Sequence, residues 1–165
     1  MALTVVDDPP DRPDWIRETV RLLADRMESG RARLLRAIDT ASDAELASGS
    51  DRDWGTGQVA VHLLIVERGV LGIAQRLARG ETSTATGQPR PAAAGVTRGG
   101  IAALAERSRR AVEAFRADFP AEPDTRTTAR HPFYGELNCF GWLLTLPNHY
   151  DAHLDAHAKG IQSAL

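Results

Sequence analysis

Long stretches of the chain carry apolar residues at the spacing of an α-helix, and this periodicity most constrains the fold. Between residues 56 and 79, one set of positions recurs at intervals of 3, 4, 4, 3 and 4 residues: Val59, His62, Val66, Val70, Ile73 and Leu77. Such intervals place the side chains on one face of a helix. No run shows the strict alternation of a half-buried strand. The pattern therefore predicts an all-α chain.

Four segments carry this helical pattern, at residues 13–39, 56–79, 98–118 and from 136–138 to about 163. Polar segments rich in Pro, Gly, Ser and Thr separate them, with a short helical turn expected near residues 43–46. The length of 165 residues and the hydrophobic share of 42% suit one globular domain. We predict a single four-helix-bundle domain over residues 1–165.

Charge and cysteine content exclude several classes of protein. Lys and Arg number 20 and Asp and Glu 22, so the net charge of −2 argues against a nucleic acid or an anionic membrane as partner. The single cysteine, Cys139, excludes an intrachain disulfide and a cysteine-based zinc site, and it favours a reducing compartment. Neither a signal-peptide pattern nor an apolar run of transmembrane length is evident. We therefore expect a cytoplasmic protein.

Three of the five histidines, His149, His153 and His157, lie four residues apart in the last predicted helix. Each step of four residues advances by about 6 Å along a helix, so the three rings form a slowly winding stripe. Two histidines at this spacing can bind one metal ion. His62 is centred on the apolar face of another helix, where an imidazole needs a partner or a metal. The pattern predicts a histidine metal site, with a hydrogen-bonded core histidine and a solvated stripe as the alternatives.

Three segments resemble the DinB/YfiT-like superfamily of metalloenzymes. They are Trp54 to His62 (WGTGQVAVH), His131 to Leu137 (HPFYGEL), and Trp142 followed by Asn148 to His153 (NHYDAH). The resemblance implies a bundle in up-down-down-up order, with a long crossover between the second and third helices. It also implies a divalent metal held by His62, His149 and His153. His157 falls outside this triad, as a further or replacement ligand, a base near the metal, or a surface residue, and no metal role is expected for His131.

Three neutral imidazoles leave a bound ion its full charge and an open position, which lowers the pKa of a bound water or thiol. Zn²⁺ fits such ligands best, and Ni²⁺, Mn²⁺ and Fe²⁺ are the alternatives. The resemblance implies a transferase or isomerase that uses a low-molecular-weight thiol, of the mycothiol or bacillithiol type, on a small electrophile. The alternatives are a metal-dependent hydrolase that detoxifies a reactive small molecule and a non-catalytic metal-binding protein of the stress response.

These alternatives make different demands on the residues around the metal. A thiol transferase needs polar or basic groups to hold the thiol, and a hydrolase needs a base. The candidates for holding the thiol are Arg52, Arg68, Arg76 and Arg130, with a solvated surface position as the alternative for each. The candidates for the base are Asp151, Asp155 and His157, and the alternative for the two aspartates is an exposed position or one outside the metal's own ligands. Trp54 and Trp142 are expected to line the pocket, with core packing as the alternative. Related proteins often pair, so a homodimer is also expected.

Overall fold

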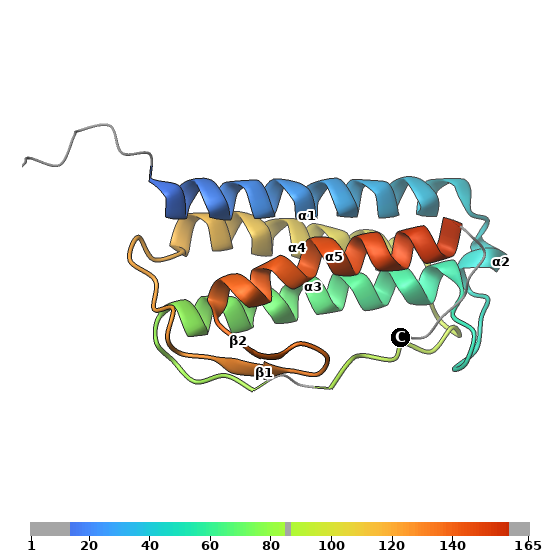
Figure 1. The fold of residues 1–165 in the computed structure, drawn as a ribbon. Coiled ribbons are helices and arrows are strands. Elements are labelled where there is room, and N and C mark those ends of the chain that lie inside the picture. The colour runs from blue at the N-terminus through green and yellow to red at the C-terminus, as the bar shows by residue number, and fades with distance from the viewer. Residues whose placement is uncertain (1–13, 85–86, 159–165) are drawn as a thin grey trace, which may run out of the picture.

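The computed structural model describes residues 14–84 and 87–158. Within them, four long helices pack lengthwise into a bundle (Figure 1). These are α1 (Trp15–Thr40), α3 (Thr56–Ala78), α4 (Arg98–Asp118) and α5 (Cys139–Ala158). A short helix, α2 (Asp43–Leu46), follows α1, and two short strands, β1 (Ala129–His131) and β2 (Gly135–Leu137), precede α5. The predicted four-helix bundle is confirmed.

The order of the helices matches the one implied by the family resemblance. Figure 1 shows α1 and α5 running in one direction and α3 and α4 in the other. Because α3 and α4 are parallel neighbours, the described parts of the segment between them, residues 79–84 and 87–97, run back along the length of the bundle. The up-down-down-up order with a long crossover is therefore confirmed.

Local hydrogen bonds explain where the helices begin. The Asp14 side chain accepts from the N–H of Arg17 at the start of α1, and the Thr97 hydroxyl accepts from Gly100 at the start of α4. At α5, Asn138 Oδ1 accepts from the N–H of Gly141 at 3.0 Å, so this helix begins just after the predicted start. Its predicted end near residue 163 lies outside the described residues.

Helix α3 is the most deeply buried element of the bundle. It is long and apolar enough to span a membrane by length and composition alone, yet 67% of its most apolar window is buried inside the bundle. Its apolar residues meet side chains of the other long helices in two clusters, one that includes Met27, Leu71 and Leu143 and one that includes Leu34, Leu64 and Leu154. This pattern is typical of the core helix of a soluble domain.

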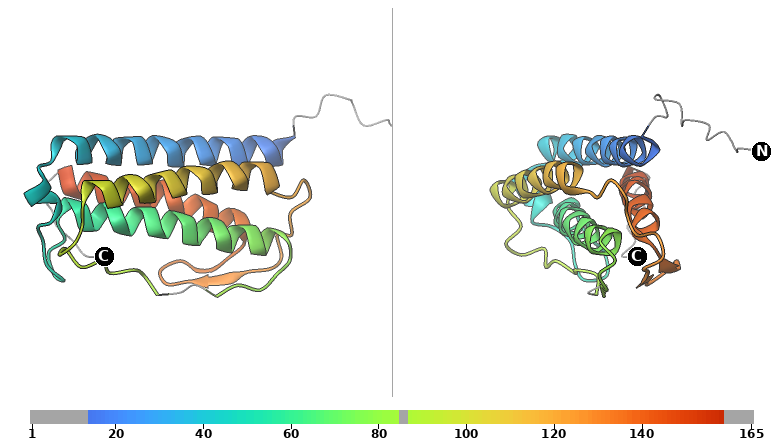
Figure 2. Two further views of the ribbon diagram at one scale, coloured as in Figure 1. Left: turned by 180° about the vertical axis from the view of Figure 1, so that it is seen from behind. Right: turned by 90° about the vertical axis from the view of Figure 1, so that its left-hand side faces the viewer.

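The hairpin formed by β1 and β2 corrects the expectation that no strands occur. Its antiparallel register pairs Ala129 with Leu137 and His131 with Gly135, whose φ of 77° lies in the left-handed region. The indole N–H of Trp142 donates to the carbonyl of Ala129 at 3.1 Å, which fixes the hairpin on α5. Strands of three residues are too short to show alternation, and packing on the bundle stabilises them. The hairpin lies on the same side of the bundle as the crossover (Figures 1 and 2).

Candidate metal centre

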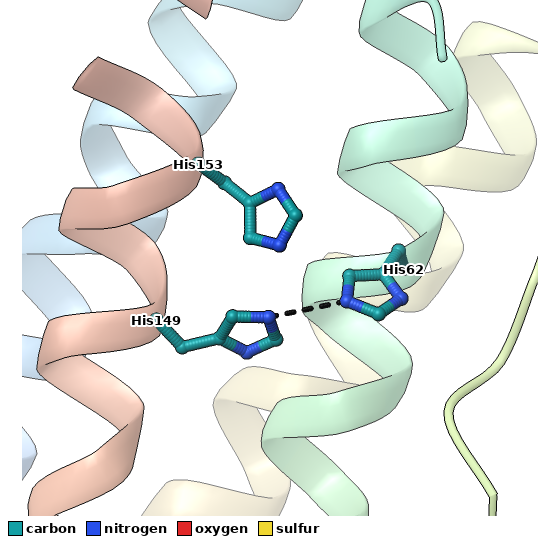
Figure 3. A group of neighbouring side chains, drawn as sticks. All are labelled: His62, His149 and His153. Carbon is teal, nitrogen blue, oxygen red and sulfur yellow. Dashed lines mark hydrogen bonds between the residues drawn. The ribbon is translucent and has the colours of Figure 1, made fainter. Parts of the chain in front are cut away.

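Three histidines from two helices converge between α3 and α5. Figure 3 shows the His62 ring reaching from α3 toward the His149 and His153 rings of α5. Each offers one nitrogen, and these ligand atoms all lie within 4.8 Å of one another. His149 and His153 share one face of α5 because they are four residues apart. The structure thus brings together the three residues predicted as ligands.

The backbone of the crossover holds the ring of His62 in a fixed orientation. Its Nδ1 lies 2.8 Å from the carbonyl oxygen of Pro89, which can only accept, so Nδ1 carries the proton. The other nitrogen, Nε2, is therefore the lone-pair nitrogen that faces the two histidines of α5. Metal-binding histidines commonly donate their second N–H to such a carbonyl. The ring of Trp54, itself buried, packs against His62 with the ring centroids 4.9 Å apart.

The spacing of the rings fits a small divalent ion. His62 Nε2 and His149 Nε2 are 3.1 Å apart. Two nitrogens bound to one tetrahedral Zn²⁺ at about 2.0–2.1 Å are separated by about 3.3 Å, so this pair is close to the spacing of two ligands. His153 supplies the third nitrogen, which lies within 4.8 Å of the other two. The donor set leaves the fourth position of a tetrahedral ion for a further ligand.

The electrostatics of the site keep the histidines neutral. Burial, together with repulsion from the neighbouring histidines, lowers the pKa of His149 to about 3. Burial and the proximity of His62 lower the pKa of His153 to about 4. Burial also lowers the pKa of His62, although its contact with Pro89 opposes the shift. Neutral imidazole is the form that binds a metal, so no proton has to leave these rings near neutral pH.

A cavity of about 120 Å³ lies beside His149 and His153, and a second cavity of about 120 Å³ shares several lining residues with it. Val66, Val70, Gln88 and His131 line both cavities. The first is also lined by Phe133, Tyr134, Thr145, Asn148, His149, Ala152 and His153, and the second by Ile65, Gly69, Ile73, Gly87, Pro89, Pro132 and Trp142. Among these described residues there is no Arg, Lys, Asp or Glu. The space next to the candidate ligands is therefore uncharged and mostly apolar.

Several residues predicted to act at this site lie elsewhere. Arg52, Arg68, Arg76 and Arg130 are exposed and line neither cavity. Asp151 and Asp155 pair with Arg33 of α1 at 2.7 and 2.9 Å, so their carboxylates are engaged away from the triad. Trp142 lines the second cavity, whereas Trp54 packs against His62 and lines neither cavity. The side chain of His157 lies outside the described part of the chain.

His131 is a cavity residue that the sequence interpretation set aside. It lines both cavities, and its ring lies 4.8 Å from the Trp142 ring and 4.8 Å from the Tyr134 ring, measured between centroids. The His-Pro segment that resembles the family was the available signal. Without the hairpin, however, nothing in the sequence brings this segment back onto the face of α5.

A buried ionic network was also missed. Glu67 of α3 is 0% exposed, and its carboxylate accepts from Arg31 of α1 and from the hydroxyl of Tyr150 of α5, each at 2.6 Å. Burial raises the pKa of Glu67, while both partners favour its ionised form. The network joins α1, α3 and α5. Its member on α5, Tyr150, directly follows the candidate ligand His149 in the sequence.

A larger cavity of about 420 Å³ lies at the other end of the bundle, near the start of α1. Its arginines already pair with carboxylates: Arg21 with Glu18 and Asp25, and Arg116 with Asp25 and Glu28. Among its described lining residues there is no histidine or cysteine. Its described lining offers no ligand set comparable with the triad.

Fold and site together define a four-helix bundle with a candidate three-histidine metal centre between α3 and α5. The sequence profile of the DinB superfamily matches residues 26–156, and the chain belongs to this superfamily. The chain is also similar to a solved structure titled "Crystal structure of TT2238, a four-helix bundle protein". The TM-score is 0.62 at 27% sequence identity, over 85% of this chain and 98% of that chain. No curated protein matches this chain.

Proposed function

We propose that this protein is a divalent-metal-dependent enzyme of the cytoplasm that joins a low-molecular-weight thiol to a small electrophile. His62, His149 and His153 are the proposed ligands, and Zn²⁺ is the metal that best suits three imidazoles. The observation that carries the proposal is the convergence of three nitrogens within 4.8 Å, beside an uncharged cavity. A non-catalytic metal-binding protein would not need that cavity.

The metal ion and the residues around it would have separate roles in this reaction. When bound, the ion would act as a Lewis acid that lowers the pKa of a coordinated thiol. Pro89 keeps the Nε2 lone pair of His62 directed at the ion. Val66 and Val70 line the cavity and exclude water from the reacting groups, which strengthens the electrostatic effect of the ion.

The absence of a carboxylate from the described cavity lining supports thiol chemistry over hydrolysis. A hydrolase benefits from a base that takes a proton from water, and Asp151 and Asp155 are held by Arg33 instead. A thiol has a pKa near 8.5 in water and needs only a modest shift to ionise. A metal ion can supply that shift without a separate base.

The lack of Arg and Lys in the described lining bears on the kind of thiol. A thiol with carboxylates, such as bacillithiol, would enter the cavity without a charged partner, which is unfavourable. An uncharged, sugar-linked thiol of the mycothiol type avoids this cost. The proposal therefore favours mycothiol as the co-substrate.

Metal analysis of protein purified without an affinity tag tests the ligand set. We expect about one Zn²⁺ per chain. His153→Ala should weaken zinc binding by more than about 100-fold, because loss of an outer hydrogen-bond partner alone costs about 10–100-fold. The histidine control, His131→Gln, should keep the metal. Equal zinc contents in wild type and His153→Ala would refute the site.

A second experiment tests the reaction. Zinc-loaded protein is mixed with mycothiol and monochlorobimane, and the fluorescent thioether is followed against a protein-free control. We expect turnover with mycothiol, weaker turnover with bacillithiol, and none for His153→Ala. If the metal-loaded protein consumes neither thiol but hydrolyses ester electrophiles, the transferase proposal is refuted and the hydrolase alternative takes its place.

A further inference from the structure

The tip of the hairpin exposes two aromatic rings beside the candidate metal centre. Phe133 is 66% exposed and Tyr134 is 62% exposed, yet both line the cavity that His149 and His153 also line. We call Phe133 and Tyr134 the hairpin tip. Large aromatic groups on a protein surface commonly mark places where a ligand packs. Here the rings lie at the open side of a cavity whose inner side holds the proposed ligands.

His131, at the base of the tip, has a defined tautomer. The backbone N–H of Phe133 can only donate, and it lies 3.1 Å from His131 Nδ1, so Nδ1 is an acceptor. The neutral ring therefore carries its proton on Nε2. Among the described residues, no acceptor contacts this Nε2–H. The tilted rings of Tyr134 and Trp142 pack against His131. Because His131 lines the cavity, its unused Nε2–H is a candidate donor to a ligand there.

The other polar groups of the cavity are also neutral. Thr145 donates its hydroxyl hydrogen to the carbonyl of Trp142 at 2.7 Å, which leaves only its lone pairs for a ligand. Gln88 and Asn148 are amides. With Val66 and Val70 as the apolar surface, the lining suits an uncharged molecule that has a flat apolar group and a hydrogen-bond acceptor.

We propose that the hairpin selects the electrophile: the hairpin tip packs on a flat apolar or aromatic group, His131 Nε2–H donates to an acceptor oxygen, and charged molecules are excluded. The inference rests on the proposed metal site, because that site sets where the reacting end of the molecule lies. It assigns the substrate class as uncharged aromatic or conjugated electrophiles. His131 is the proposed polar specificity residue.

The test uses Co²⁺-substituted protein, whose visible spectrum reports ligands that reach the metal. The probes are acetohydroxamate, benzohydroxamate and 4-carboxybenzohydroxamate. We expect benzohydroxamate to bind at least about tenfold more tightly than acetohydroxamate, since the phenyl ring is buried against the tip. The carboxylate of 4-carboxybenzohydroxamate should abolish this gain in affinity. The Phe133→Ala, Tyr134→Ala double variant should bind the two uncharged probes equally, whereas Glu136→Gln, on the outer face of the hairpin, should keep the preference.

A pair of His131 variants isolates the donor. His131→Phe keeps a ring to stack but has no N–H, and it should weaken both uncharged probes by about threefold to tenfold. His131→Gln, which restores an N–H near the same place, should recover most of that loss. Cobalt binding with no preference for the phenyl group would overturn this inference and leave the metal site intact. Failure to bind cobalt would overturn both.

Discussion

The buried ion pair between Arg31 and Glu67 gives the sharpest prediction about stability. Replacing Arg31 by Met keeps most of the side-chain volume but leaves the Glu67 carboxylate buried without its positive partner. Glu67 is 0% exposed and the Arg31 side chain only 8%, so water cannot replace the lost contact. We expect the free energy of unfolding to fall by about 3–5 kcal/mol, the usual cost of breaking a buried pair on one side.

Urea unfolding followed by circular dichroism at pH 7.5 measures this loss. Three further variants make the result specific. Arg33→Met, on the same helix but 41% exposed and paired with acidic residues of α5, should cost less than about 1 kcal/mol. Tyr150→Phe removes one donor to Glu67 and should cost about 1–3 kcal/mol. The double variant Arg31→Met, Glu67→Met should recover most of the loss, because two apolar groups can replace a buried pair.

The pH dependence offers an independent check. Burial raises the pKa of Glu67, so acid neutralises this carboxyl more readily than an exposed one. Once it is protonated, the bare charge left by Arg31→Met disappears, and the cost of the substitution should shrink as the pH falls. A cost below about 1 kcal/mol at pH 7.5, or one that grows toward acid pH, would refute the reasoning.

Three more predictions follow from other contacts. In Gly30→Ala, the new Cβ would lie 2.7 Å from Tyr150 Cγ, so we expect a loss of about 1–3 kcal/mol, whereas Gly72→Ala, which meets nothing within 4 Å, should stabilise by about 0.5–1 kcal/mol in urea unfolding. In metal-free protein, the lowered pKa values of His149 and His153, about 3 and 4 against 6.5, mean that the unfolded chain takes up protons first. The free energy of unfolding should therefore fall as the pH drops from about 6.5 to 4.5, and it should fall less in the His149→Gln, His153→Gln double variant. Zinc at about 1,000 times its Kd should stabilise the wild type by about 4 kcal/mol in thermal unfolding and should leave His153→Ala nearly unchanged.

The helices were predictable because their apolar periodicity is strong. The bounds of α4, Arg98–Asp118, agree with the prediction, and α3 ends one residue before its predicted end. Proline and glycine residues flank these helices and limit the positions at which each helix can begin or end. The last helix is less certain from sequence because Asn138, which caps it, follows a turn-rich segment with several plausible starts.

The hairpin was not predictable for a physical reason. Its strands are three residues long, and the bond from Trp142 to Ala129 contributes to holding them. Such long-range contacts leave no local pattern in the sequence. The sequence did not predict His131 as a cavity residue for the same reason, since its place beside the cavity depends on the hairpin.

The sequence does contain a pattern that indicates the buried ionic network. In α1, several buried positions follow one another at helical spacing: Val20, Ala24, Met27, Arg31, Leu34 and Ile38. Arg31 therefore lies within the apolar stripe. Glu67 likewise falls in line with Ala60, Leu64, Leu71 and Ala74 of α3. A charged residue in register with an apolar stripe predicts a buried charge that needs a partner. Which opposite charge it meets depends on the packing of the helices, which the sequence does not state.

The topology of the bundle and the candidate site depend on each other. A short turn between α3 and α4 would make these helices antiparallel and would leave no chain beside the middle of α3. The long crossover instead passes this region, where the Pro89 carbonyl fixes His62 and Gln88 lines both cavities. Gln58, buried one turn before His62, anchors the same segment by donating to the Pro91 carbonyl at 2.8 Å. The crossover is therefore part of the site, since it orients one proposed ligand and closes one side of the cavity.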